Sequence, residues 1–152
     1  MKVPAYINER SAWENSFTFF VPIKVRFSET DAFGHVNNTS AFIYFEHARL
    51  EFFESCGLME DWAASSSNAI VVAADLQCNY VAQIKYGDTL HVGVKVDKIG
   101  RSSLDIHYVA KRNTDICLTG RGTMVQVDKQ TGEALPFSEG MLAKLTSCKK
   151  TT

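Results

Sequence analysis

Residues 29–38, with the sequence ETDAFGHVNN, form the part of the chain that is richest in side chains capable of chemistry. The carboxylate of Asp31 can serve as a general base or a nucleophile, and it can equally serve as a turn or cap residue. Gly34 fits a tight turn with positive φ, or a place where the backbone comes close to a ligand. His35 is a candidate base and also a candidate for an ordinary hydrogen-bonded side chain. On the pattern alone, both interpretations stay open for each residue.

The neighbouring segments must position this cluster. Residues 19–27 alternate between apolar and polar side chains, which predicts a strand, and Pro22 predicts an edge strand because it has no N–H to donate to a neighbour. Residues 40–56 carry apolar side chains at three- and four-residue steps, which predicts a long helix that ends at Gly57. Asp31 then lies in the strand-to-helix connection, where four other residues can cap the helix: Asn37, Asn38, Thr39 and Ser40.

From Ile70 to about residue 128 the pattern predicts four further strands, joined by turns too short for parallel crossovers. The apolar residues of the last strand change from even to odd positions, which predicts a bulge at Gly120 or Gly122. Residues 59–68 are predicted to be a loop, and a short helix is predicted at the C-terminus. One long helix with one antiparallel sheet is an α+β fold, predicted as one domain over residues 1–152 with its core at about 17–147.

The composition excludes several classes of function. The 152 residues carry a formal net charge of −1, which gives no electrostatic reason to expect a nucleic-acid partner or an anionic membrane. No apolar run is long enough to span a bilayer, and the first residues do not resemble a signal peptide, so we expect a cytoplasmic location.

Motifs for other kinds of site are missing from the sequence. It has no HExxH, GxSxG, P-loop or GxGxxG pattern, so we expect no metal site, serine hydrolase or nucleotide site. Its four cysteines, at positions 56, 78, 117 and 148, are widely and irregularly spaced without a CxxC pair. We therefore expect four buried free thiols.

The segments ETDAFGHVNN and YFEHARLEFF together resemble the 4-hydroxybenzoyl-CoA thioesterase-type hotdog family of acyl-CoA thioesterases. YGDTLHVGVKV and IGRSSLDIHYV, which follow in the expected order, resemble the central strands of that family. The resemblance implies a hotdog fold, in which a five-stranded, curved antiparallel sheet wraps around one long helix. It also implies a dimer that joins the two sheets, often paired into a homotetramer, with active sites at the subunit interface.

The resemblance further implies roles for individual residues. Asp31 would be the catalytic carboxylate, as nucleophile or as general base for water. Its pocket would include Gly34, His35, Val36, Asn38 and Tyr44. Backbone N–H groups near Ala69, Ile70 and Val71 would stabilise the oxyanion, and Arg101, Ser102 and Ser103 would bind coenzyme A unless they form a simple hairpin turn. The acyl-CoA thioester would be a substrate, with no resident cofactor or metal.

In one position the chain departs from the family pattern. Relatives often have tyrosine ten residues after the catalytic aspartate, where this chain has Ala41. We expect this change to enlarge or reshape the site near the first helical turn. Two alternative functions stay open: a thioesterase for acyl carrier protein, and a hotdog protein that binds acyl-CoA without turnover.

Overall fold

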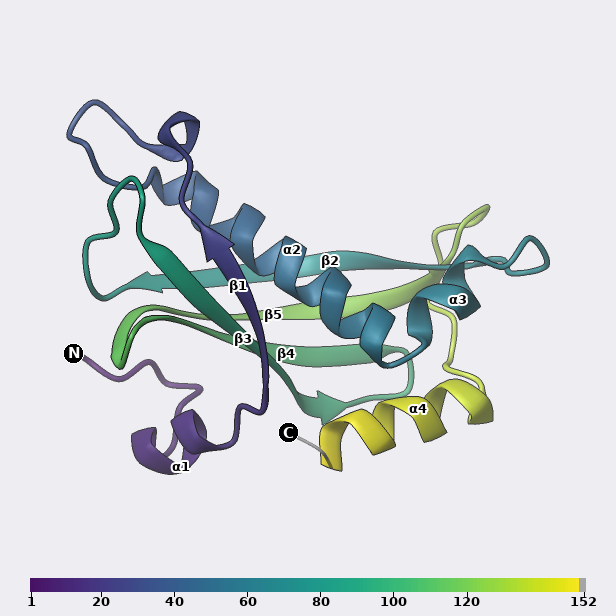
Figure 1. Cartoon of the computed structure of the whole chain (residues 1–152). Coiled ribbons are helices and arrows are strands. Elements are labelled where there is room, and N and C mark those ends of the chain that lie inside the picture. The colour runs from purple at the N-terminus through teal and green to yellow at the C-terminus, as the bar shows by residue number, and fades with distance from the viewer. Residues whose placement is uncertain (151–152) are drawn as a thin grey trace.

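The computed structural model describes residues 1–150. A long helix, α2, lies at its centre, and a curved five-stranded sheet wraps around this helix (Figure 1). The strands are antiparallel in the order β1-β3-β4-β5-β2. The elements in chain order are α1 (Arg10–Asn15), β1 (Phe19–Lys24), a 3-10 turn (Phe27–Glu29), α2 (Asn38–Ser55), α3 (Leu58–Ala63), β2 (Ala69–Tyr80), β3 (Thr89–Ile99), β4 (Ser103–Arg112), β5 (Asp115–Asp128) and α4 (Glu139–Lys150). The predicted α+β hotdog fold is confirmed, and β1 with Pro22 is an edge strand.

Helix α2 begins at Asn38 rather than at the predicted Ser40, because Asn37 is its N-cap and accepts a hydrogen bond from the Thr39 N–H. Two short helices, α1 and α3, were not predicted. α3 occupies part of the predicted loop and buries Leu58 and Trp62, one turn apart. Six residues are too few to show a helical period, so the sequence pattern could not distinguish this segment from a loop.

The helix is seated on the sheet through Phe45. Its ring stacks on the ring of Tyr108 from β4, with centroids 4.6 Å apart. It also lies directly over Gly120, where an added Cβ would come within 2.5 Å of the Phe45 ring. Gly120 is therefore required for close approach of helix and sheet. Arg49, one turn further along α2, is buried and donates a hydrogen bond to the Tyr108 hydroxyl.

The predicted bulge at Gly120 or Gly122 is wrong. Both glycines lie in the regular ladder with β2, opposite Cys78 and Leu76. Two register shifts involve β5 at other places. One lies opposite the break between Ala73 and Asp75 of β2, where the Asp75 carboxylate accepts the Thr123 N–H, and the other lies against β4, where Ala110 pairs with Leu118 and Lys111 with Ile116. The sequence change from even to odd apolar positions arises because the even positions of β5 stay buried while Val125 and Val127 are half-buried on the other face.

The prediction of four free thiols is wrong for two of the cysteines. Cys56, at the end of α2, forms a disulfide with Cys148 in α4, while Cys78 and Cys117 are free. The two bonded cysteines are 92 residues apart in the sequence, so spacing gave no sign of the pairing. The bond fixes α4 beside the end of the central helix.

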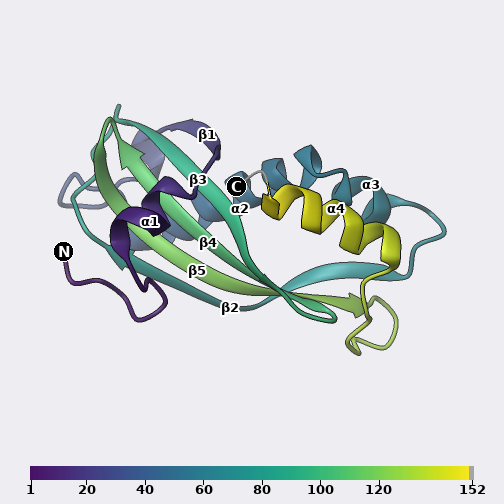
Figure 2. The same cartoon turned by 90° about the horizontal axis from the view of Figure 1, so that it is seen from below.

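The N-terminal segment covers the outer face of the sheet, opposite the central helix (Figure 2). Trp13 of α1 and Phe17 pack with Val109 and Ile116 in a small second core. Among residues 1–150, no helix is long and apolar enough to cross a membrane.

Candidate active site

Asp31 organises a tight turn just before the central helix. Its Oδ1 accepts the backbone N–H groups of Phe33 and His35, at 2.9 and 3.3 Å. Its own N–H donates to the His35 carbonyl at 2.8 Å, and Gly34 supplies the positive φ of 77° that closes the turn. Asp31 is exposed, and the cap of α2 is Asn37, so the carboxylate does not serve as the helix cap.

The Asp31 turn is attached to the connection between β2 and β3. His35 forms a β-bridge with Lys85, and the Val36 N–H donates to the Ile84 carbonyl at 2.7 Å. Asp88 holds this connection in place, because its carboxylate accepts both the Lys85 N–H and the Arg112 guanidinium. These contacts, the backbone N–H first, lower the pKa of Asp88 below its usual range.

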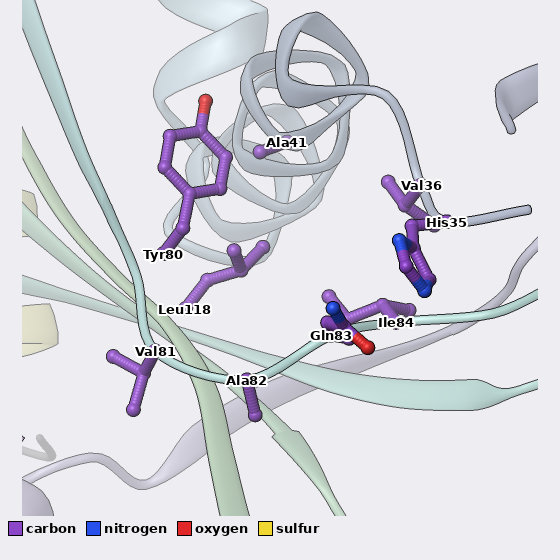
Figure 3. Close-up of a pocket in the computed structure, with 9 residues that line it drawn as sticks. All are labelled: His35, Val36, Ala41, Tyr80, Val81, Ala82, Gln83, Ile84 and Leu118. Atoms are coloured by element: carbon purple, nitrogen blue, oxygen red, sulfur yellow. The ribbon is translucent and has the colours of Figure 1, made fainter. Parts of the chain in front are cut away.

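A cavity of about 230 Å³ lies between the start of α2 and this connection (Figure 3). Tyr80 and Leu118 lie on one side of it, His35 and Gln83 on the other, and Ala41 reaches it from the first turns of α2. The full lining is His35, Val36, Ala41, Tyr80, Val81, Ala82, Gln83, Ile84 and Leu118. The surface is mainly aliphatic, with polar groups from three side chains, an arrangement typical of a small-molecule pocket.

Tyr80 is held in place by the helix. Its hydroxyl donates a hydrogen bond to the Asn38 carbonyl at 2.6 Å. Partial burial raises the pKa of Tyr80 to about 12, so its hydroxyl stays protonated near neutral pH and remains a donor. Burial also raises the pKa of the nearby Cys78 thiol to about 11, which leaves it protonated and excludes it as a thiolate nucleophile. The carboxylate of Asp31 accepts a hydrogen bond from the backbone N–H of His35, and His35 lines the cavity.

Comparison with known proteins identifies the family. The model of the thioesterase-like superfamily matches residues 25–145. The chain belongs to the thioesterase-like superfamily. It is 40% identical to the uncharacterized protein YsmA of Bacillus subtilis (strain 168), over 91% of this chain and 93% of that protein.

Two further relatives carry names that state an activity. The acyl-acyl carrier protein thioesterase ATL3 of Arabidopsis thaliana is 32% identical over 72% of this chain and 58% of its own length. A thioesterase from Thermus thermophilus, crystallised with coenzyme A and Zn, superimposes with a TM-score of 0.76 at 28% identity, covering 89% of this chain and 97% of the other. The chain is therefore a thioester hydrolase of the hotdog type.

The structure of this thioesterase brings together only some of the predicted site residues. His35 and Val36 line the cavity, whereas Asp31 and Gly34 belong to the adjoining turn and do not line it themselves. Asn38 contributes its carbonyl, as the acceptor for Tyr80. Tyr44 faces away, into a separate groove of about 690 Å³ between β1 and α2 that Glu29 also lines. Its hydroxyl is buried with no hydrogen-bond partner in the part of the chain that the structure describes, and burial raises its pKa.

The residues predicted to stabilise the oxyanion and to bind coenzyme A lie at the end of the sheet opposite the cavity. Ala69, Ile70 and Val71 begin β2, whereas the cavity lies at its far end beyond Tyr80. The Ala69 N–H already donates to the Ser67 hydroxyl at 3.1 Å. Residues 101–103 form the turn between β3 and β4, about 30 Å along β3 from the Asp31 end. Within one chain, neither group reaches the cavity.

Six lining residues were not predicted: Tyr80 and Leu118, and the consecutive residues Val81, Ala82, Gln83 and Ile84, which follow β2. The only sequence signal of these four consecutive residues is an apolar run that continues past the end of β2 before the turn residues of YGD. In residues 1–150 one group has side chains close enough for a metal ion, Asp97, Asp105 and His107, on the outer face away from the cavity. The His107 Nδ1 there already accepts the Trp13 N–H.

Proposed function

We propose that the protein hydrolyses acyl-CoA thioesters to a free acid and coenzyme A, with Asp31 as the catalytic carboxylate. The observation that carries the proposal is the hydrogen bond from the backbone N–H of His35, a residue that lines the apolar cavity, to the exposed Asp31 carboxylate. The coenzyme A held by the Thermus thermophilus relative supports the same substrate class. No resident cofactor is required, because coenzyme A arrives as part of the substrate and leaves as product.

In the proposed reaction, water or the Asp31 carboxylate attacks the thioester carbonyl and the C–S bond breaks. When Asp31 itself attacks, the acyl group is held on it as a mixed anhydride, and water then hydrolyses this anhydride to the free acid and restores the carboxylate. The proton released by water ends on the coenzyme A thiolate. A general base at this position contributes about 10²–10⁴-fold in rate. Both roles of Asp31 need the same ionised oxygen.

We infer that two copies join through β2 and that the active site is completed between them. Within residues 1–150 no strand pairs with the outer edge of β2, a run of 12 residues. This edge exposes Ile70 and Val72, 38% and 39% accessible, which is unusual for a strand left in water.

The direction of β2 explains how a partner copy would complete the site. Antiparallel pairing of two β2 strands about a two-fold axis places the partner's first residues, equivalent to Ala69–Val71, beside Tyr80 of this chain. The turn at residues 101–103 is linked to the same end, because Ser103 pairs with Val125 and Val125 with Val72. That turn would lie about three strand spacings, about 14 Å, from the neighbouring cavity, where Arg101 can meet a coenzyme A phosphate at the end of the pantetheine arm.

The decisive variant is Asp31→Asn, because an asparagine Oδ1 can still accept the Phe33 and His35 N–H groups and keep the turn. A matched control is Glu9→Gln, since the Glu9 carboxylate accepts two backbone N–H groups in the same way, from Ser11 and Ala12, at the start of α1 on the outer face of the sheet. We expect Asp31→Asn to lose about 10²-fold or more in kcat on acyl-CoA and the control to keep its rate. A rate for Asp31→Asn within about threefold of wild type contradicts the assignment.

The similarity to ATL3 favours a second candidate substrate, the acyl group carried on acyl carrier protein. Both thioesters share the pantetheine arm, so the same cavity and carboxylate would act on each. The formal net charge of −1 offers no excess of basic groups for an acidic carrier protein. Parallel assays with one acyl group on either carrier decide between them, and tight binding of acyl-CoA without turnover would instead identify a binding protein.

A further inference from the structure

Two residues from different elements line one part of the cavity: Ala41 of α2, and Tyr80 at the end of β2, whose side chain is 53% exposed in the single chain. Ala41 is fully buried in α2, and the Tyr80 ring lies across the cavity wall from it (Figure 3). The Tyr80 hydroxyl is tied to the carbonyl of Asn38, one helical turn before Ala41. This hydrogen bond fixes the position of the Tyr80 ring relative to the helix turn that carries Ala41.

The size of the cavity limits what it can hold. Its volume is about 230 Å³. An apolar protein cavity of about 150 Å³ is already large enough to bind benzene. One aromatic ring with a short linker, or an aliphatic chain of middle length, therefore fills the space. A long fatty-acyl chain would extend beyond the space that one chain provides.

The small side chain at position 41 creates part of this space. Much of the lining is aliphatic, including Val36, Val81 and Leu118, so extra carbon atoms at position 41 would occupy the volume an acyl group needs. Tyr80 acts in the opposite sense, because its bulk closes the wall that a smaller residue would open.

From these contacts we propose that Ala41 and Tyr80 together set the size of the acyl group, selecting a compact apolar acyl group of one ring or a medium-length chain. The inference rests on the proposed acyl-CoA thioesterase function and adds its substrate class. The two residues act as a pair, since each fills space that the other leaves. They determine specificity and take no part in the chemical step.

The test compares propionyl-, octanoyl-, benzoyl- and palmitoyl-CoA by thiol release, with binding of the matching non-hydrolysable thioethers measured by calorimetry. We expect the wild-type protein to favour octanoyl or benzoyl over palmitoyl by about 10-fold or more in kcat/KM. Ala41→Leu should lower octanoyl and benzoyl turnover by about 10-fold or more relative to propionyl turnover by the same variant. Ala143→Leu makes the same change at an exposed position of α4 and should leave the profile unchanged.

Tyr80→Ala provides the opposite test, since opening the wall should raise palmitoyl turnover relative to octanoyl by about 10-fold. The double variant Ala41→Leu/Tyr80→Ala should return the profile toward that of wild type, because the two volume changes compensate. Non-additive effects of this kind are expected only for residues that share one space.

The outcomes separate the two proposals. Turnover of acyl-CoA with the same chain-length profile in wild type, Ala41→Leu and Tyr80→Ala overturns the role of the pair and leaves the thioesterase function standing. Size-selective binding of the thioethers without turnover supports the pair and overturns the proposed catalysis. A protein that neither binds nor hydrolyses any of the four compounds overturns both.

Discussion

The indole Nε1 of Trp13 donates a hydrogen bond of 2.9 Å to Nδ1 of His107, joining the N-terminal segment to the outer face of the sheet. Since this bond uses the lone pair of Nδ1, the neutral His107 ring carries its proton on Nε2. That nitrogen is buried with no hydrogen-bond partner among residues 1–150, 3.6 Å from an Asp105 oxygen. Protonation of Nδ1 would remove the acceptor of the Trp13 bond.

The stability of the N-terminal segment should therefore depend on pH. Burial lowers the pKa of His107, against the opposing effect of Asp97 and Asp105, and Lys95 and Arg121 lower it further. The folded pKa then lies below the unfolded value of about 6.5, so the unfolded chain binds more protons. The stabilisation is present above pH 6.5 and is lost progressively as the pH falls below it.

Unfolding free energies at pH 7.5 and 5.5 test this expectation. His107→Gln should remove this pH-dependent contribution, so that its free energy of unfolding falls less than that of wild type between the two pH values. His47→Gln, at an exposed position of α2, should keep the full pH dependence of wild type. Equal pH dependence in the wild type and His107→Gln would show that this histidine does not couple folding to protonation.

Substitution in the free edge of β2 tests the proposed dimer. Val72→Lys should give a monomer by light scattering and lower kcat/KM by about 10-fold or more, since a lysine on an edge strand opposes pairing and the partner's residues leave the site. Leu142→Lys is the matched control, because Leu142 in α4 is 36% exposed and Val72 39%. A wild-type monomer with full activity is incompatible with a shared site, and a tetramer would reveal a further interface in the same measurement.

The contact between Phe45 and Gly120 predicts an intolerance of even one methyl group. Gly120→Ala should lower the free energy of unfolding by about 1–3 kcal/mol, because the new Cβ meets the Phe45 ring and the Gln77 carbonyl, which is backbone and cannot rotate away. Gly140→Ala, in the first turn of α4 with no atom closer than 4.0 Å to its added Cβ, should be neutral or stabilising. Chemical denaturation of both variants measures the difference in their free energies of unfolding. Equal values would mean that the helix can move away from the new Cβ without loss of stability.

The disulfide between Cys56 and Cys148 predicts a response to reductant. Reduction should lower the free energy of unfolding by about 2–4 kcal/mol, because a bond that closes a loop of this length restricts the unfolded chain. Cys56→Ser should be insensitive to reductant, whereas Cys78→Ser, at a free cysteine, should respond like the wild type. Four reactive thiols in the denatured, unreduced protein would show that the bond does not form. In a reducing compartment such as the cytoplasm, the two cysteines would be kept as free thiols.

Local patterns predicted the elements that have a clear period. The alternation in β1 and the three- and four-residue steps of α2 reflect burial of one face, which the sequence records directly. Helix α3 has no such record, because six residues provide only two buried positions, Leu58 and Trp62. A bulge was expected at Gly120 or Gly122 because the apolar positions of β5 change from even to odd. The same change arises without a bulge when both faces of a strand are covered.

The site was predicted only where its residues are neighbours in the sequence. Asp31, Gly34 and His35 share one turn, and a motif can carry them. Tyr80 and Ile84 reach the cavity through strand pairing and a loop bridge, contacts that no spacing in the chain reveals. Tyr44 lies three residues from Ala41 and on a similar side of the helix, yet the two line different spaces, because three residues leave a rotation of about 60° and a rise of about 4.5 Å along the axis.

The direction of β2 has a consequence for mixtures of chains. If each site takes Asp31 from one copy and the turn at Arg101 from the other, a chain with Asp31→Asn and a chain with Arg101→Ala are each defective at both sites of their own dimer. A mixed dimer instead collects both defects in one site and leaves its second site intact. Two inactive preparations, unfolded and refolded together, should then regain activity, which a protein with self-contained sites could not do.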